Sequence, residues 1–227
     1  MRIVAIIPAR GGSQSIPRKN LVKINEKPLI GWTIEAALKS KYVSKTIVTS
    51  EDEEILHVST DFGASTIVRP LKYSTDQSMM VDVVLDSLKQ LENQGQTYDT
   101  FILLQPTSPG RNAEDIDRAI RLFQRSKATG LISGYVPEKS PYKAFRLTKL
   151  GWLRGLVDNI APFNNRQQLP PTFYPNGAIY IFYIKEFLTK KSFLTTRTIP
   201  YLMPSNKNAD LDTITDLKKY EDILKKR

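Results

Sequence analysis

The sequence contains no cysteine and only one histidine among its 227 residues. Without cysteine, the chain can form no disulfide framework, thiolate metal site or cysteine nucleophile. The lone histidine, His57, gives little basis for a Ser-His-Asp triad. No stretch approaches the ~18 apolar residues of a membrane span, and the apolar run Ile3 to Ile7 is shorter than a signal-peptide core. We therefore expect a cytoplasmic chain without a membrane partner.

Positive charge is the main feature of the composition. Lys and Arg number 33 against 23 Asp and Glu, which gives a net charge of +10. Such an excess fits a nucleic-acid partner, a small polyanion such as a nucleoside triphosphate, or merely a well-solvated surface. The basic residues 225–227 at the end of the chain favour the last interpretation for that part of the charge. The length suits one α/β domain, so we expect residues 1–227 to fold as a single unit.

Strand-like and helix-like segments alternate through the first two thirds of the chain. Apolar runs predict strands at residues 3–7, 47–49, 66–68, 101–104, 131–135 and 178–183. Helical periodicity predicts helices that begin near Pro28, at a Ser50–Glu53 capping box, after Asp76, after Asn112 and near Thr213. This alternation predicts an α/β fold, a doubly wound and mainly parallel Rossmann-like sheet. In such sheets, ligands bind beyond the carboxyl ends of the strands.

The pattern changes after about residue 137. Six prolines crowd residues 137–176, a segment with few helical stretches. We expect this segment to protrude from the sheet and to serve contacts rather than the core.

A basic glycine loop follows the first predicted strand. Gly11 and Gly12 let the backbone approach a ligand closely, and the amides around Ser13 can point at phosphate oxygens. Arg10 and Lys19 add positive charge. The loop matches neither the P-loop nor the GxGxxG pattern. From the residues alone it is either a phosphate-binding loop or an ordinary glycine turn with solvated cations.

Two aspartates near the end of the chain, Asp210 and Asp212, are spaced two residues apart. In an extended segment such residues project to the same side, where two carboxylates could share one Mg²⁺ ion. Alternatively, both are solvated and Asp212 caps the last helix. In the loop after the strand at 101–104, Gln105 and Ser108 offer neutral hydrogen bonds that suit sugar hydroxyls. A proline-stiffened turn without a ligand is the alternative there.

Several motifs, in order along almost the whole chain, resemble the cytidylyltransferases that activate sialic acids and related nonulosonic acids. The opening PARGGSQSIPRKN is similar to the PARGGSKGIPRKN typical of that family. The motifs that continue the resemblance are KPLI from Lys27, VRP from Val68, STD from Ser74, LLQPTSP from Leu103, RQQLP from Arg166, PNGAIY from Pro175 and DLDT from Asp210. Each motif alone has little specificity, but the ordered set is highly specific.

The resemblance implies transfer of CMP from CTP to the anomeric hydroxyl of an acidic nine-carbon sugar, with release of pyrophosphate. It assigns the triphosphate to Arg10 and Lys19, cytosine to Asn20 and Arg69, and Mg²⁺, which Mn²⁺ can replace, to Asp210 and Asp212. Lys19, Arg10 and Asp212 are the expected catalytic residues. The residues expected at the sugar are Gln105, Ser108, Lys143, Arg166, Gln167 and Tyr174. The protruding segment is expected to reach into a second subunit of a homodimer, without a nucleic-acid partner.

Four positions depart from the family pattern. Gln14 and Ser15 replace the usual Lys-Gly, and Gly110 replaces a common Leu. Tyr174 stands where enzymes for sialic acid often have an Arg. That change favours a related sugar such as legionaminic or pseudaminic acid. The open alternatives are a 3-deoxy-manno-octulosonate cytidylyltransferase, a nucleic-acid-binding protein and a homologue that binds without catalysis.

Overall fold

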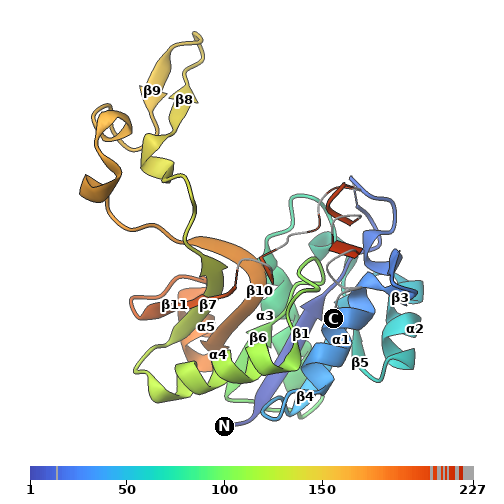
Figure 1. Cartoon of the computed structure of the whole chain (residues 1–227). Helices are drawn as coiled ribbons and strands as arrows, with labels where there is room; N and C mark the ends of the chain where they lie inside the picture. Colours follow the sequence, from blue (N-terminus) through green and yellow to red (C-terminus); the bar gives the residue numbers. More distant parts are fainter. Residues whose placement is uncertain are drawn as a thin grey trace.

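A seven-stranded sheet forms the centre of the molecule (Figure 1). The computed structural model describes residues 1–13, 15–204, 207–208, 211, 213, 215–217 and 220–221. The strands follow the order β11-β7-β10-β6-β1-β4-β5. Their bounds are β1 Ile3–Pro8, β4 Lys45–Ser50, β5 Ser65–Val68, β6 Thr100–Leu103, β7 Gly130–Tyr135, β10 Tyr174–Tyr183 and β11 Thr198–Leu202.

Helices cover both faces of the sheet, which agrees with the burial of all six residues of β1. Ile3, Ala5 and Ile7 belong to one apolar cluster, which includes residues of α1 (Leu29–Leu38), α2 (Glu53–Asp61) and α4 (Ala113–Arg125). Val4 and Ile6 belong to a second cluster with α3 (Met80–Asn93) and α5 (Ile184–Lys190). Because successive side chains of β1 point to opposite faces and both faces are covered, every position of the strand is apolar. The predicted doubly wound α/β fold is confirmed.

The sheet is parallel except for β10, which is antiparallel to both of its neighbours, β6 and β7. From β1 the chain winds outward to β4 and β5, then crosses to β6 on the other side of β1. The reversal occurs between β1 and β6, and the carboxyl ends of β1, β4, β5 and β6 lie at one edge. This edge is the topological switch point, where such sheets bind their ligands.

A protruding arm, residues 136–173, leaves the sheet at the end of β7 and returns at the start of β10 (Figure 1). It contains a two-stranded sheet, β8 (Phe145–Leu147) with β9 (Leu153–Gly155), that the sequence did not predict. Three short 3-10 helices complete it: η3 (Pro141–Lys143), η4 (Ala161–Phe163) and η5 (Arg166–Gln168). Tyr174 pairs with Tyr135, so residues 174–176, which the sequence assigned to the excursion, belong to β10.

Two of the predicted helix caps are wrong. The α2 helix is capped by Asp52, whose carboxylate accepts from Ile55 N at 3.0 Å, whereas Ser50 is the last residue of β4. Asp76 does not cap α3, which begins four residues later at Met80. The Thr75 amide donates to the Ser78 hydroxyl and the Ser78 amide to the Thr75 carbonyl, and this local turn competes with the helix.

Other predicted helix ends are confirmed. Pro28 precedes α1, and Asn112 forms a capping box with Asp115 at the start of α4. At the predicted start near Thr213, Thr213 and Asp216 form a reciprocal pair, since each amide donates to the other residue's side chain. Ile214 and Leu224, two apolar residues that follow Thr213 in the sequence, lie outside the described residues.

Some elements and exposures were not predicted. No prediction was made for α5, for β11 or for the short hairpin of β2 (Lys23–Ile24) with β3 (Lys27–Pro28). Leu38 is apolar but exposed, because it is the last residue of α1. None of the helices in the described part of the chain combines the length and apolarity needed to cross a membrane.

Gly110, where relatives of the resembled family have Leu, is explained by Tyr220. A Cβ atom at Gly110 would collide with the Tyr220 hydroxyl. Tyr220 is 1% exposed and packs with Ile24, Leu29 and Leu211. The missing side chain at Gly110 therefore makes room for an aromatic ring that attaches the end of the chain to the body.

We predict that Gly110→Leu lowers the free energy of unfolding by about 1–3 kcal/mol, the usual cost of overpacking a filled core. Urea denaturation measures the change. Tyr220→Ala should relieve part of this cost, so the double variant should lose less than the sum of the single losses. Gly12→Ala is the control, because a Cβ there has no neighbour within 4 Å. A Gly110→Leu variant as stable as the parent would contradict this explanation.

Candidate functional site

A cavity of about 700 Å³ opens at the switch-point edge of the sheet. Its lining includes three cationic side chains, Arg10, Lys19 and Arg69, and one carboxylate, Asp76. The remaining lining residues are Pro8, Gly12, Ser13, Ser15, Asn20, Met80, Gln105, Pro106, Thr107 and Thr213. Segments from the start, middle and end of the described chain thus meet at one polar, mainly cationic cavity.

The two glycines of the predicted phosphate loop have different surroundings. The Gly11 amide donates to Glu51 Oε1 at 2.8 Å, and a Cβ at Gly11 would collide with the Asp52 carboxylate. Gly12 is exposed, lines the cavity and has no such neighbour. The Gly11 amide is therefore engaged by the protein, whereas Gly12 and Ser13 are the part of the loop that faces the cavity.

The unusual Ser15 causes no strain in this loop. Its φ is not positive, and the left-handed conformation falls on Arg18, with φ 51° and ψ 38°. The Arg18 guanidinium is held by ion pairs with Asp52 at 2.9 Å and Glu54 at 2.8 Å. These contacts at the start of α2 stabilise the turn that leads into Lys19 and η1 (Lys19–Leu21). Gln14 lies outside the described residues.

Arg69 is a buried residue that several hydrogen bonds hold in place. It is 4% exposed. Its Nη2 donates to the Ala9 carbonyl at 2.9 Å and to Glu51 Oε2 at 2.7 Å, and its Nε donates to the Ser74 hydroxyl at 3.0 Å. Nη1 makes no hydrogen bond to any described residue, and Arg69 lines the cavity. The guanidinium is thus fixed on one side and open on the other.

Asn20 lies beside the same loop and is also buried. Its side-chain amide donates to the Arg10 carbonyl at 2.9 Å. This bond fixes the orientation of the amide, and Asn20 contributes to the cavity wall together with Arg69. The two residues expected to contact cytosine are therefore brought to one cavity.

Arg10 forms an ion pair with Asp76, and both residues line the cavity. The guanidinium and carboxylate are 2.5 Å apart, and both side chains remain substantially exposed. Lys19 lines the same cavity and is half-buried. Asp76, mistaken for a helix cap from the sequence, is thus the acidic member of the cavity wall.

Gln105 lies where β6 ends and depends on a glycine opposite. A Cβ at Gly177 would collide with Gln105 Oε1, and Gly177 adopts a positive φ of 70°. Gln105 lines the cavity. Ser108, expected beside it, is fully buried, and its hydroxyl donates to the Asn176 carbonyl at 2.9 Å. Gln105 therefore faces the cavity, whereas Ser108 is engaged with β10.

The buried Arg111 holds the loop that follows β6 in place. Arg111 donates to the carbonyls of Gln105 and Ala178 and to the Thr33 hydroxyl, which connects the β6 loop to β10 and α1. Burial lowers the pKa of Arg111 to about 9, against the raising effect of Tyr220 and Asp115. The guanidinium remains charged at neutral pH and holds the loop beneath Gln105.

The other residues expected at the sugar lie away from this cavity within one chain. Lys143 and Arg166 line a small cavity in the protruding arm together with Glu138, Lys139 and Ser140. Tyr174 lines another cavity at the base of the arm, and Gln167 is exposed on η5. A single chain therefore brings Gln105 to the main cavity, but not the cationic residues of the arm.

The predicted metal ligands, Asp210 and Asp212, lie outside the described residues. Two residues that alternate with them are described: the Leu211 amide donates to the Thr107 carbonyl at 3.0 Å, and Thr213 lines the main cavity. Lys207 forms an ion pair with buried Asp115 at 2.6 Å, and Asn208 accepts from Asn176 at 2.8 Å. Among the described side chains, no group of three or more His, Asp or Glu could hold a metal ion.

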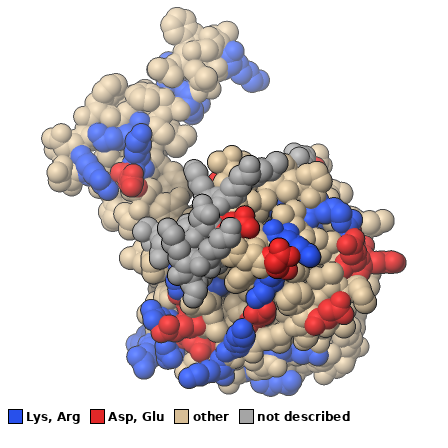
Figure 2. Space-filling view, turned by 45° about the vertical axis from the view of Figure 1, so that its right-hand side comes forward, with Lys and Arg blue, Asp and Glu red and all other residues tan. Residues whose placement is uncertain are grey.

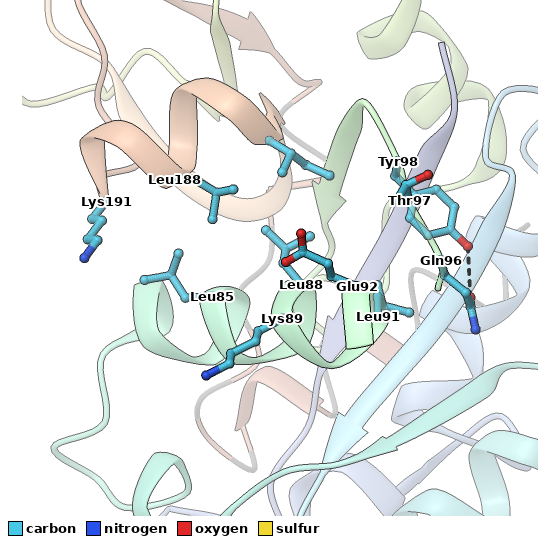
Figure 3. Close-up of a pocket in the computed structure, with 11 residues that line it drawn as sticks. Leu85, Leu88, Lys89, Leu91, Glu92, Gln96, Thr97, Tyr98, Leu188 and Lys191 are labelled. Atoms are coloured by element: carbon cyan, nitrogen blue, oxygen red, sulfur yellow. Dashed lines mark hydrogen bonds between the residues drawn. The ribbon is translucent and has the colours of Figure 1, made fainter. Parts of the chain in front are cut away.

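A second cavity, of about 430 Å³, is lined by residues of α3 and α5 and by residues 96–98 before β6. Figure 3 shows Leu85, Leu88 and Leu188 facing one another across it. It lies toward the edge at which β6 begins. Its wall is mainly apolar, so it lacks the convergent cations of the main cavity.

A family model described as "Cytidylyltransferase" matches residues 4–226. The chain belongs to the cytidylyltransferase family. The resemblance drawn from the ordered motifs is thereby confirmed, and the match includes the glycine loop, the β6 loop and the aspartate pair.

Relatives that act on nonulosonic acids cover almost all of the chain. An N-acylneuraminate cytidylyltransferase of Streptococcus agalactiae is 35% identical over 95% of this chain and 52% of its own length. The chain thus spans about half the length of the first curated relatives it matches. A CMP-N,N'-diacetyllegionaminic acid synthase of Legionella pneumophila is 34% identical over 99% of this chain and 97% of the relative. A pseudaminic acid cytidylyltransferase of Campylobacter jejuni is 32% identical over 96% and 94%.

Solved structures agree on the fold. A CMP:2-keto-3-deoxy-manno-octonic acid synthetase complexed with CTP superposes with a TM-score of 0.71 at 18% identity, over 100% of this chain and 99% of the other. A 4-diphosphocytidyl-2C-methyl-D-erythritol synthase gives the same TM-score at 15% identity, over 98% and 99%. At these identities the likeness concerns the Rossmann-like nucleotidyltransferase fold.

Sequence reasoning missed Glu51, the carboxylate that contacts both Gly11 and Arg69. It lies in the run SEDEE at the end of β4, where several acidic residues resemble a solvated helix start. The available signal was its place directly after a buried parallel strand, the position from which such sheets present functional side chains.

We predict that Gly177→Ala destabilises the protein by more than the strain of its left-handed backbone alone, which is about 1–2 kcal/mol. The added methyl must displace Gln105. Gly95→Ala is the matched control, because Gly95 has φ 72° and no neighbour within 4 Å of a Cβ. Guanidinium denaturation of both variants isolates the collision. Equal losses would show that Gly177 does not restrain Gln105.

Proposed function

We propose that the chain transfers CMP from CTP to the anomeric hydroxyl of a nonulosonic acid and releases pyrophosphate. The observation that carries this proposal is the main cavity, in which a member of the cytidylyltransferase family gathers Arg10, Lys19 and Arg69 with Asn20. Three cations match the charge of a triphosphate, and an amide beside a guanidinium suits the donor and acceptor edge of cytosine.

In this proposal, CTP is bound at two ends. Arg10 and Lys19 hold the phosphates, with the amides of Gly12 and Ser13 as further donors. Arg10 exchanges Asp76 for phosphate when the nucleotide enters. Arg69 presents Nη1 to the base, and the Asn20 amide, oriented by the Arg10 carbonyl, completes the base site.

Gln105 is the proposed sugar ligand from the chain itself, supported by its place on the cavity wall. The relatives act, by their names, on N-acylneuraminate, pseudaminic acid and legionaminic acid. Tyr174 in place of the usual Arg favours one of the last two. The main alternative is 3-deoxy-manno-octulosonate, because one structure of similar fold is a synthetase for that sugar.

We propose that Asp210 and Asp212 hold a Mg²⁺ ion, for which carboxylate oxygens are suitable ligands. Support comes from the family match, which includes the pair, and from the buried Leu211 between them, since alternation in an extended segment would leave both aspartates together on the side opposite Leu211. A bound Mg²⁺ would neutralise charge on the α-phosphate and on the leaving pyrophosphate.

The reaction proposed is an in-line displacement at the α-phosphorus. The sugar oxygen forms the new P–O bond as the bond to pyrophosphate breaks, and the hydroxyl proton leaves to solvent or a base. No covalent intermediate with the protein is needed. Lys19 and Arg10 stabilise the negative charge that develops on the phosphates, and Gln105 orients the sugar.

We also propose that two copies form a homodimer through the protruding arm. The arm carries many exposed apolar side chains: Phe145, Leu147, Leu150, Trp152, Leu153, Leu156, Val157, Ile160 and Phe163. An isolated two-stranded hairpin is marginally stable, and an apolar surface of this kind calls for a partner. Lys143 and Arg166 would then complete the sugar site of the partner with charges that suit a carboxylate.

A nucleic-acid partner has less support. Basic and acidic side chains are interspersed over the body of the molecule on the face shown in Figure 2, although the arm is mainly basic. In residues 137–173 there are six basic and two acidic residues. We attribute this charge to the acidic sugar. We further propose a cytoplasmic location, which the lack of cysteine permits.

Pyrophosphate release tests the function directly. We expect release with CTP, Mg²⁺ and one of a panel of nonulosonic acids, and loss of release when EDTA removes the metal. Lys19→Ala should reduce kcat at least 100-fold, because charge stabilisation of this kind contributes about 10²–10³ in rate. Lys23→Ala, an exposed lysine outside the cavity, is the charge-matched control and should remain active.

Release with 3-deoxy-manno-octulosonate alone would favour the alternative sugar. Steeply salt-dependent binding of RNA or DNA without pyrophosphate release would reject the enzyme in favour of a nucleic-acid-binding protein.

The arm proposal has its own prediction. Trp152→Glu with Ile160→Glu should convert a dimer to a monomer in sedimentation measurements, because charges would be buried in the interface. Leu194→Glu, an exposed leucine outside the arm, should leave the mass unchanged. Mixing inactive Lys19→Ala chains with inactive Lys143→Ala/Arg166→Ala chains should restore activity in hybrid dimers. No restoration would mean that each chain completes its own site.

A further inference from the structure

We infer that Glu51 is a positioning residue for nucleotide recognition: it fixes the Arg69 guanidinium and the glycine loop together, and thereby sets the preference for cytosine over uracil. This inference rests on the proposed function and extends it to a residue outside the predicted site.

Glu51 directly follows β4 and uses both carboxylate oxygens. Oε1 accepts from the Gly11 amide at 2.8 Å, and Oε2 accepts from Arg69 Nη2 at 2.7 Å. Arg69 Nη2 also donates to the Ala9 carbonyl, so the loop after β1 and the end of β5 meet at one carboxylate. A carboxylate bound at both oxygens restrains both partners.

The pair is largely withdrawn from solvent, with side-chain exposures of 14% for Glu51 and 4% for Arg69. Burial by itself would raise the pKa of Glu51, but the hydrogen bonds from Arg69 and from backbone amides, with the charge of Arg69, hold that pKa below its usual value. Glu51 is therefore ionised at neutral pH. Removing its charge would leave a buried guanidinium without its counterion, which is strongly unfavourable.

The restraint of Arg69 by Glu51 should affect recognition of the base more than binding of the phosphates. The N3 atom of cytosine accepts a hydrogen bond, whereas N3 of uracil carries a proton and cannot accept one. A fixed guanidinium that offers Nη1 favours the acceptor, and a mobile one can turn away from the uracil proton. Arg10 and Lys19 lie at the phosphate end of the proposed site.

The test measures equilibrium binding of CTP and UTP by titration calorimetry to the full chain and to Glu51→Gln. We expect CTP affinity to fall about tenfold, in the range for loss of one charged hydrogen-bonding partner, with a much smaller loss for UTP. The CTP to UTP preference should therefore fall about fivefold or more. Arg69→Ala should cost less in the Glu51→Gln background than in the parent, because the two residues act together.

Glu35→Gln is the matched control. Glu35 also forms ion pairs, with Lys27 and Lys39, but lies on α1 away from the cavity, so its variant should keep the parent's preference. If Glu51→Gln fails to fold, Glu51→Asp decides, since it keeps the charge but is too short to hold both partners; it should bind CTP with reduced preference.

An unchanged preference in Glu51→Gln, or equal losses for CTP and UTP, would overturn the inference. Failure of the parent chain to bind CTP would instead reject the proposed function, so the two failures are distinguishable.

Discussion

The buried ion pair between Glu51 and Arg69 is the interaction on which the rest of the site depends. It joins the carboxyl ends of three parallel strands, because Arg69 also donates to the Ala9 carbonyl beyond β1. The Gly11 amide is fixed by the same carboxylate. With these ends tied together, Gly12 and Lys19 occupy defined places on the cavity wall. The cationic side chains of the cavity thus come from segments that are fixed to the ends of the strands. This arrangement limits reorganisation when a charged ligand enters.

The sequence predicted most of the sheet because its signals were strong and local. Continuous apolar runs such as Ile3 to Ile7 have no other stable place than a covered strand. Asn112 was recognised as a cap because it stands directly before an apolar helical repeat, and in the structure its side chain forms a capping box with Asp115. Asp76 was misassigned because the side chains of its neighbours Thr75 and Ser78 form a turn that delays the helix. Glu51 was overlooked because its two partners, Gly11 and Arg69, are distant in sequence. The direction of β10 likewise depends on tertiary packing and left no local signal.

The protruding arm and the body differ in where their large apolar side chains lie. In the body, large apolar residues are buried in two clusters on either side of the sheet. In the arm, Leu147, Trp152 and Ile160 are exposed, and five of the six residues of the β8–β9 hairpin are exposed. The prolines there and the scarcity of helical stretches predicted an excursion but not a hairpin, since an exposed strand of three residues leaves no burial pattern. An interface with a second copy would remove this apolar surface of the arm from water.

The tip of the arm offers an exposed position for a chemical label in a chain that has no cysteine. Leu150 is 83% exposed beside Gly151, whose positive φ marks the turn between β8 and β9. Because the chain has no cysteine, a thiol introduced at Leu150 would be unique in the molecule. A spin label or fluorophore attached there would report the distance between two arm tips without a background signal. Labels at the tip of the arm would therefore measure the geometry of any assembly that this chain forms.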